Sequence, residues 1–190
     1  MNKTRRLPRA FYARPVLEVA RDLLGRPLCR RRSGASTLRG RIVEVEAYDG
    51  PHDLACHASR GRTKRTSPMF ERGGIAYVYL VYGVHHCFNV VTGEVGYPAA
   101  VLIRATEPPD ESLRTSGPGR LTKAFDIDRS LDGTTLSGKE LWIEAGEPVQ
   151  DEAVRRTPRI GVDYAGEWAR RPYRLLIAGH PAVSGPRGLR

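Results

Sequence analysis

Hydrophobic positions near the start of the chain recur with helical spacing. Within residues 15–24 the apolar side chains repeat at intervals of three and four, which gathers them on one face of a helix: Val16, Val19, Ala20, Leu23 and Leu24. Pro15 is well suited to the first turn of such a helix, and Gly25 is well suited to ending it. We therefore predict a helix over 15–24 whose apolar face packs on the core.

Most of the other apolar segments are short, and their patterns predict strands. Two pairs of segments are separated by turn-forming residues, so each pair is predicted to form a hairpin. The first hairpin joins 27–32 to 37–48, and the second joins 75–82 to 86–92 through a turn near Gly83. Two further strands are predicted over 99–106 and 173–178.

The remaining segments contribute little regular structure. A short helix is predicted over 118–127, a glycine-containing segment over 160–168 precedes the last strand, and the Pro- and Gly-containing tail from His180 is expected to be loose. Several short strands with few helices, and no repeat or linker, predict a single α+β domain over 1–190. We expect a curved antiparallel sheet flanked by helices, with one hairpin that protrudes.

A long connection between two predicted strands attracts attention. Residues 49–68 are rich in Gly, Pro, His, Arg and Ser, and they show no strand or helix pattern. Ordered loops of this length are uncommon in compact domains and are usually functional. We therefore expect this segment to contribute to a site.

Composition places the chain among globular proteins. Of its 190 residues 40% are apolar and 27% are charged, and no run approaches the roughly 18 apolar residues of a membrane span. The basic N-terminus is followed by no apolar stretch, which argues against a secretory signal. Three cysteines, Cys29, Cys56 and Cys87, are too far apart in sequence to form a CxxC pair, which favours a reducing compartment. A soluble, cytoplasmic protein without membrane partners is expected.

The net charge of +10 is unevenly distributed along the chain. Residues 1–65 contain 16 Lys and Arg against 6 Asp and Glu, whereas the rest contains 15 of each. A concentrated positive field suits a polyanion such as nucleic acid, because phosphate attraction supplies affinity that is independent of sequence. A generic solvated face or an RNA-associated protein would have the same composition, so charge alone leaves the partner open.

The predicted strand over 41–48 carries two carboxylates. Strand alternation places Glu44, Glu46 and Tyr48 on one face together with Ile42, and the intervening apolar side chains on the other. Like charges in line on one face repel each other, so their presence needs an explanation. Either the face is polar and solvated, or a carboxylate is held near a substrate as a general base with an aromatic side chain beside it.

The second hairpin carries three tyrosines. Tyr77 and Tyr79 share a face, and for Tyr77 ordinary packing is the simpler interpretation. Tyr82 lies at the hairpin tip, where a rigid aromatic side chain in a basic protein is suited to insertion between base steps. The neighbouring His85, His86 and Cys87 are adjacent on one strand and point to alternating faces, so they cannot converge on one ion, and no metal site is predicted.

Six long motifs in this sequence resemble the alkyladenine (3-methyladenine) DNA glycosylase family, the eukaryotic-type group that also occurs in bacteria. The resemblance extends from about residue 7 to residue 178, and the motifs follow the order of that family over 38–174: LRGRIVEVEAYDGPHDLACHASRGRT, MF, YVYLVYGVHHCFNVV, AAVLIRATEP, SGPGRLTKAFDI and RIGVDYAGEWARRPYR. Such an ordered set is highly specific. Two positions depart from the usual pattern, namely Thr66, where Asn is frequent, and Val84, where larger apolar residues are common.

The resemblance implies a role for individual residues. Glu46 would be the general base that activates water for attack on the sugar, and Arg104 and the main-chain carbonyl of Ile160 would help to hold that water. The flipped purine would lie between Tyr48, His57 and Tyr79. Asn89 would act as a gate against normal guanine, and Tyr82 would be the DNA-intercalating wedge.

The implied activity is that of a monofunctional glycosylase. It would flip alkylated or deaminated purines, such as 3-methyladenine, hypoxanthine and ethenoadenine, out of double-stranded DNA and hydrolyse their bond to the sugar in base excision repair. No cofactor is implied, and a monomer is expected. A non-catalytic nucleic-acid-binding module is the main alternative. An acyl- or formyl-transfer enzyme is disfavoured because the chain lacks a nucleophile elbow.

Overall fold

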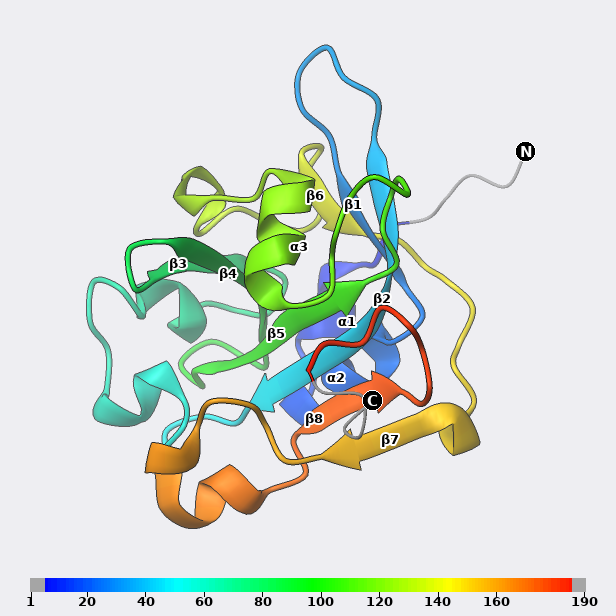
Figure 1. The fold of residues 1–190 in the computed structure, drawn as a ribbon. Helices are drawn as coiled ribbons and strands as arrows, with labels where there is room; N and C mark the ends of the chain where they lie inside the picture. The colour runs from blue at the N-terminus through cyan, green and yellow to red at the C-terminus, as the bar shows by residue number, and fades with distance from the viewer. Residues whose placement is uncertain (1–5, 186–190) are drawn as a thin grey trace.

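A computed structural model describes residues 6–185 as one sheet with helices on both of its faces (Figure 1). The eight strands of the described chain are β1 Pro27–Arg30, β2 Leu38–Tyr48, β3 Ala76–Val81, β4 His85–Thr92, β5 Ala99–Thr106, β6 Leu141–Ile143, β7 Val154–Thr157 and β8 Arg174–Ile177. Their pairing is antiparallel throughout, in the order β3-β4-β5-β2-β1-β6, with β8 added to β2 and β7 added to β8. This confirms the predicted α+β class and the antiparallel sheet.

The long strand β2 organises the sheet because it has different neighbours along its length. Its first half pairs with β1 and its second half pairs with β8, while β5 lies along its other edge. The last residues of β2 therefore lie between two strands, and both faces of the strand are covered: Val43, Val45 and Ala47 are fully buried, and so are the carboxylates on the opposite side. A side chain near the end of β2 is thus held firmly by the surrounding sheet.

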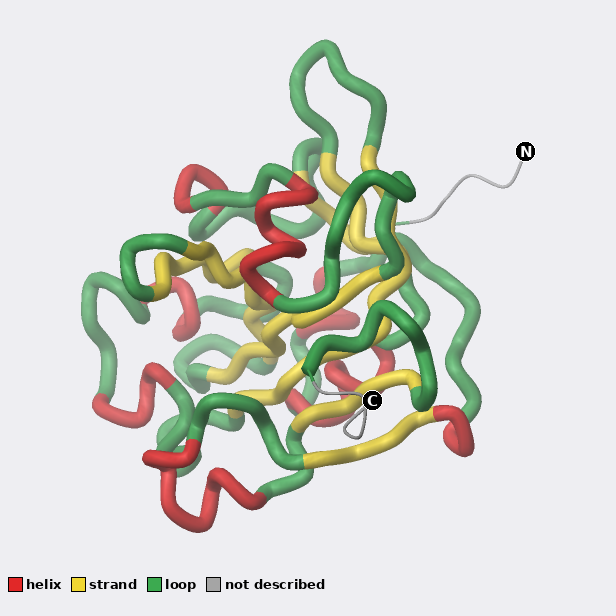
Figure 2. Tube along the Cα trace, viewed as in Figure 1, coloured by secondary structure: helices red, strands yellow, loops and turns green. Residues whose placement is uncertain are grey.

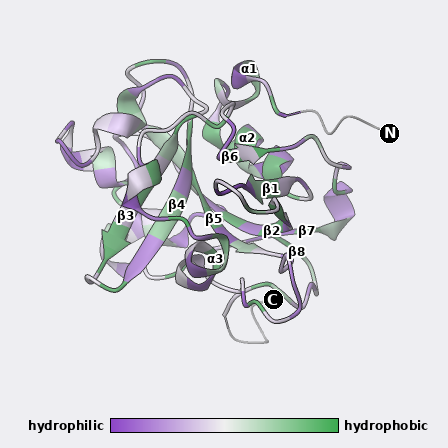
Figure 3. Ribbon diagram, turned by 90° about the horizontal axis from the view of Figure 1, so that it is seen from above, coloured by the Kyte–Doolittle hydropathy of each residue, from purple (hydrophilic) through white to green (hydrophobic). Residues whose placement is uncertain are grey.

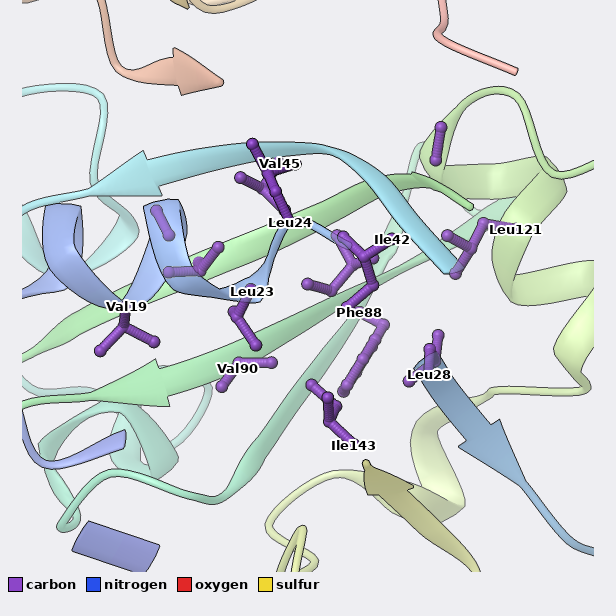
Figure 4. Packing of buried hydrophobic residues seen from close by; sticks show 14 of the residues in the cluster. Val19, Leu23, Leu24, Leu28, Ile42, Val45, Phe88, Val90, Leu121 and Ile143 are labelled. Atoms are coloured by element: carbon purple, nitrogen blue, oxygen red, sulfur yellow. The ribbon is translucent and has the colours of Figure 1, made fainter. Parts of the chain in front are cut away.

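Three α-helices lie on the two faces of the sheet: α1 Arg9–Tyr12, α2 Val16–Leu23 and α3 Pro118–Phe125. Helix α2 packs on β2 and β5 from one face and α3 packs on β4 and β5 from the other, an arrangement visible in both ribbon views (Figures 1 and 3). Figure 4 shows the core formed by α2 and the strands, in which Leu23 lies beside Val90 and Phe88 lies between Ile42 and Ile143. The predicted apolar face of the first long helix is therefore confirmed.

The predicted strands and helices are present with shifts of one or two residues at their ends. The sequence patterns did not predict α1, β6 or β7, each of which has four residues or fewer, nor five short 3-10 helices: His57–Arg60, Ser67–Phe70, Arg129–Leu131, Asp151–Ala153 and Asp163–Arg170. Elements this short contain too few apolar positions to establish a period. The first two of these 3-10 helices lie in or beside the predicted 49–68 loop, and Figure 2 shows them among long loops beside the end of β2.

The pairing of β2 with β5 is irregular where the carboxylates lie. Glu44 pairs with Ala105 but the next residue, Val45, pairs with Ile103, so Arg104 is an extra residue on β5. A compensating extra residue, Val43, lies on β2. Bulges of this kind redirect side chains and are frequent next to active sites. The predicted alternation of β2 therefore does not continue unbroken from Ile42 to Tyr48.

Buried ionic contacts hold the 49–68 segment against the rest of the fold. Asp53 is fully buried and accepts hydrogen bonds from both terminal nitrogens of Arg159, one of them at 2.8 Å. The same guanidinium donates to the carbonyls of Ala47 and Trp168 at 2.8 and 3.0 Å. Thr66 does not cap the following turn; its hydroxyl accepts instead from the backbone N–H of Thr63 at 2.9 Å. The segment is thus an ordered part of the domain.

The expectation of a loose tail from His180 is wrong for residues 180–185. Val183 is fully buried, and the side chain of His180 lies 3.1 Å from a carboxylate oxygen of Glu107. Ser184 is buried and is hydrogen-bonded to Glu44. Pro and Gly made the segment resemble a free end, but tertiary contacts fix it. The rest of the tail lies outside the described residues.

Candidate active site

The end of β2 opens into a cavity of about 470 Å³. Sites for small molecules in proteins are of this order of size, and combine apolar walls with a few polar groups. All eight residues predicted for the site contribute to its walls: Glu46, Tyr48, His57, Tyr79, Tyr82, Asn89, Arg104 and Ile160. They come from β2, β3, β4 and β5, from the 3-10 helix that begins at His57, from the β3–β4 turn and from the loop that contains Ile160. The fold thus gathers into one place residues that are up to 114 positions apart.

Glu46 is one of the residues that line this cavity. Its side chain is fully buried, and one carboxylate oxygen accepts a hydrogen bond from the backbone N–H of Ile160 at 2.8 Å. The guanidinium of Arg104 lies 3.2 Å from the same oxygen, and the hydroxyl of Tyr48 donates to the other oxygen at 2.9 Å. A buried carboxylate surrounded by donors is held in one orientation, as a group that acts on a bound molecule must be.

Glu44 is buried as completely as Glu46, which excludes a polar, solvent-facing strand as the reason for the two carboxylates. Arg104 and Arg174 each donate to one of its oxygens, at 2.8 and 2.7 Å. Burial alone would lower the pKa of Arg104, but the charges of Glu46 and Glu44 outweigh it and raise that pKa. Arg104 therefore stays charged and lies between the two carboxylates.

Tyr48 forms one wall of the cavity. Burial, and then the charge of Glu46, raise the pKa of its hydroxyl well above the usual value, so it stays protonated and continues to donate. The guanidinium of Arg159 stacks under its ring, with 4.8 Å between the guanidinium carbon and the ring centroid. Because Arg159 is also paired with Asp53, the ring is supported from below by the contact that anchors the loop.

A cluster of aromatic side chains forms another wall. The His57 ring packs edge-on against Tyr79, with 4.5 Å between the ring centroids, and its Nδ1 lies 3.0 Å from the hydroxyl of Tyr77. Burial, and then the charge of Arg65, lower the pKa of His57 to about 4, so the ring is neutral at neutral pH. Burial also raises the pKa of Tyr77 to about 12. The rings of this wall are therefore uncharged at neutral pH.

Asn89 lies in β4 directly opposite Tyr77 of β3 and is buried. Its amide donates to the carbonyl of Tyr77 at 3.0 Å, which fixes the direction in which the side chain projects. The neighbouring wall residue Cys87 has a thiol whose pKa is raised by burial, so it is held as a neutral thiol.

Tyr82 lies at the tip of the β3–β4 hairpin with 96% of its surface exposed. The turn is closed by the N–H of Val84 and the carbonyl of Val81 at 3.0 Å. Both central residues, Tyr82 and Gly83, have positive φ values, of 49° and 70°. Gly tolerates this conformation but a bulky residue rarely adopts it. The hairpin thus presents a large aromatic ring to solvent at the edge of the cavity.

Sequence reasoning did not single out Arg65 or Tyr164, which also line the cavity. Arg65 lies in the predicted functional loop, and its guanidinium carbon is 5.0 Å from the centroid of the Tyr79 ring. Tyr164 is 72% exposed, in the 3-10 helix that follows Ile160. The loop's length was the available signal for Arg65, whereas no periodic pattern marked Tyr164. Within residues 6–185, no group of three or more His, Cys, Asp or Glu is placed to hold a metal ion.

The comparisons with known proteins match nearly the whole chain. The family model described as methylpurine-DNA glycosylase matches residues 10–181. The chain belongs to the methylpurine-DNA glycosylase family. This confirms the resemblance found in the sequence and makes the protein a DNA glycosylase of the repair class.

Several curated relatives agree with this placement and are similar over their full length. A protein of Myxococcus xanthus is 54% identical over 184 residues, which cover 95% of this glycosylase and 94% of the relative. Proteins of Methanocella arvoryzae and Legionella pneumophila are 50% and 49% identical, over 94% and 95% of this chain and 95% and 98% of their own. All three bear the name "Putative 3-methyladenine DNA glycosylase". Within residues 6–185, no helix is long and apolar enough to span a membrane.

Proposed function

We propose that this glycosylase flips alkylated or deaminated purines out of duplex DNA and releases them by hydrolysis, with Glu46 as the general base. The observation that supports the proposal most directly is the position of Glu46: a fully buried carboxylate that lines a cavity together with several aromatic side chains. An uncompensated buried carboxylate is unfavourable, and here donors from three separate segments compensate it. Such an arrangement is typical of a group held for chemistry.

The reaction needs a water molecule, a base and stabilisation of positive charge. Glu46 accepts a proton from water as the water oxygen bonds to the sugar C1′, and the electron pair of the N-glycosidic bond leaves with the purine. Positive charge develops on the sugar as that bond breaks, and the carboxylate stabilises it electrostatically. Arg104 and the Ile160 carbonyl are the proposed partners of the water.

The aromatic walls suit a flipped purine. Tyr48, His57 and Tyr79 all line the cavity and offer aromatic surfaces on which a flat base can stack. Asn89 is the proposed gate against the amino group of guanine, since its amide is fixed by Tyr77. Tyr82 is the proposed wedge that fills the gap left in the duplex. The proposed substrate is therefore double-stranded DNA, bound by a monomer.

Substitution of the proposed base tests this function. Glu46→Gln keeps the size of the side chain but cannot take up the proton, so the single-turnover release of hypoxanthine or 3-methyladenine from a defined duplex should fall by roughly 100- to 10,000-fold. Binding of the same duplex, measured by fluorescence anisotropy, should change little. The assay is run across a panel of lesion duplexes, with an undamaged duplex for comparison.

Glu144 offers a matched control for this variant. Its side chain is also buried and accepts hydrogen bonds from Arg39 and Trp142, but it lies beside β6, away from the cavity. Glu144→Gln should therefore keep the wild-type release rate. Full activity of Glu46→Gln would refute the assigned base. Salt-sensitive DNA binding without release from any lesion would instead favour the non-catalytic binding module.

A further inference from the structure

The second buried carboxylate, Glu44, has more partners than a stabilising ion pair requires. One of its oxygens accepts from the Nε atoms of Arg104 and Arg174 and from the hydroxyl of Ser184, at 2.8, 2.7 and 2.9 Å. The other accepts from the backbone N–H of Ser184 at 2.6 Å. Buried ion pairs contribute little net stability on average. The four hydrogen bonds that the Glu44 carboxylate accepts therefore indicate that its position, and that of its partners, must be precise.

Arg104 connects this cluster to the proposed base. Its Nε is bound to Glu44, one terminal nitrogen donates to the Ser184 hydroxyl at 3.2 Å, and the other lies 3.2 Å from Glu46. A guanidinium is planar and its donors have a fixed geometry. Two of its nitrogens held on one side therefore determine where the third nitrogen points.

We infer that Glu44 and Ser184 are positioning residues, which hold Arg104 so that it touches Glu46 through one nitrogen only. This inference rests on the proposed function. A guanidinium released from Glu44 is free to rotate and form the two-pronged pair with Glu46 that arginine and carboxylate prefer. Such a pair would add a charged donor to the Glu46 oxygen that now accepts only from Tyr48, and would make that oxygen a poorer acceptor for the proton of water. Glu44 acts as a competing acceptor that prevents it.

Through Ser184, the C-terminal segment 180–185 contributes hydrogen bonds to the cluster around Glu44. The segment is anchored by the fully buried Val183, whose carbonyl accepts from the hydroxyl of Ser116 at 3.3 Å. The carbonyl of Ser184 accepts from Arg174 at 3.0 Å. A residue 140 positions away from Glu44 thus supplies two of the hydrogen bonds to its carboxylate.

The first test separates rate from binding. Ser184→Ala keeps the backbone N–H but removes the hydroxyl, and should slow single-turnover release from the best lesion duplex about tenfold, because small displacements of reacting groups have large effects. Glu44→Gln should slow it about 100-fold. Duplex affinity should stay within a factor of three in both. Ser184→Thr, which retains the hydroxyl, should recover most of the rate.

The second test asks whether Glu44 acts through Glu46. If it does, Glu44→Gln combined with Glu46→Gln should be no slower than Glu46→Gln alone, since groups that act as a unit are not additive. Fully additive losses would overturn the inference. So would a wild-type rate in folded Ser184→Ala. Glu144→Gln controls for the loss of a buried carboxylate, with thermal unfolding measured for every variant.

A crystal structure of Ser184→Ala or Glu44→Gln provides a readout that does not depend on activity. Rotation of Arg104 toward a two-pronged contact with Glu46 is expected, and an unmoved guanidinium would contradict the inference. If Glu44→Gln fails to fold, Ser184→Ala still decides, because it leaves all charges in place. An inactive wild type would refute the proposed function. If the wild type is active and these substitutions leave its release rate unchanged, only the positioning roles are refuted.

Discussion

Tyr82 occupies a backbone conformation that its side chain does not favour. A non-glycine residue in the left-handed region is destabilised by roughly 1–2 kcal/mol, and nothing in the fold compensates a ring that is almost fully exposed. An Asn-Gly pair would suit this turn far better than Tyr-Gly. Local strain maintained at an exposed position supports a role in binding.

Tyr82→Asn should therefore change stability and function in opposite directions. The free energy of unfolding should rise by about 1 kcal/mol, because Asn adopts the left-handed turn readily. Release of a purine from duplex DNA should slow, because the proposed wedge is lost. Urea denaturation and single-turnover release measure the two effects. A variant that is more stable and equally fast would show that the ring has no part in the reaction.

At the residue scale, the sequence could indicate most of the candidate site but not its internal geometry. Glu46, Tyr48 and Tyr79 stood out because charge and aromatic rings alternate on predicted strands. The different contacts of Glu44 and Glu46 could not be predicted from the sequence, since both are glutamates on one strand. Their difference depends on Arg104, Arg174 and Ser184, whose approach is a property of the folded chain.

At the scale of elements, a buried ion pair is one of the contacts that hold the 49–68 segment. Asp53 and Arg159 join it to the segment that carries Ile160, and Arg159 also supports the ring of Tyr48. The length and composition of the loop indicated a functional element. Its anchor could not be predicted, because the two partners lie 106 positions apart.

Asp53→Asn should destabilise the protein by about 3 kcal/mol, because it leaves the charge of Arg159 buried without its counter-ion. Replacing both partners, as Asp53→Leu with Arg159→Met, should recover a large part of this loss, since no charge then remains buried. Unfolding in urea provides the measurement. A loss for the double variant equal to or greater than that for Asp53→Asn would contradict this view of the pair.

At the scale of the whole molecule, positive charge is concentrated in the first third of the sequence but is less concentrated in the folded structure. Six arginines of the basic first third form ion pairs with acidic residues from the later part of the chain: Arg21 with Asp151, Arg30 with Glu140, Arg32 with Asp126, Arg39 with Glu144, Arg41 with Glu107 and Arg62 with Glu71. Linear charge counts cannot anticipate such pairing. In the described part of the chain, Arg60, Lys64 and Arg65 form no ion pair with a carboxylate, and Arg65 lines the cavity.

These three residues are the best candidates for contacts with DNA phosphates. Duplex affinity should fall linearly with the logarithm of salt concentration, because cations on the protein displace counter-ions from DNA. Lys64→Gln should weaken binding to damaged and to undamaged duplexes by the same factor. It should also reduce the slope of log affinity against log salt concentration by about one. Lys139→Gln, an exposed substitution next to β6, should leave the slope unchanged. Equal slopes for wild type and Lys64→Gln would place the phosphate contacts elsewhere.

The paired bulges of β2 and β5 have a consequence for how this enzyme can vary. Val43 and Arg104 are each an extra, unpaired residue in the ladder. Because one lies on β2 and the other on β5, the register of the two strands is the same before and after them. Ordinary substitutions can change the residues around the carboxylates, but a single insertion or deletion in either strand would shift every later pair by one. The two bulges therefore depend on each other: the register is preserved only if both extra residues are kept or both are lost.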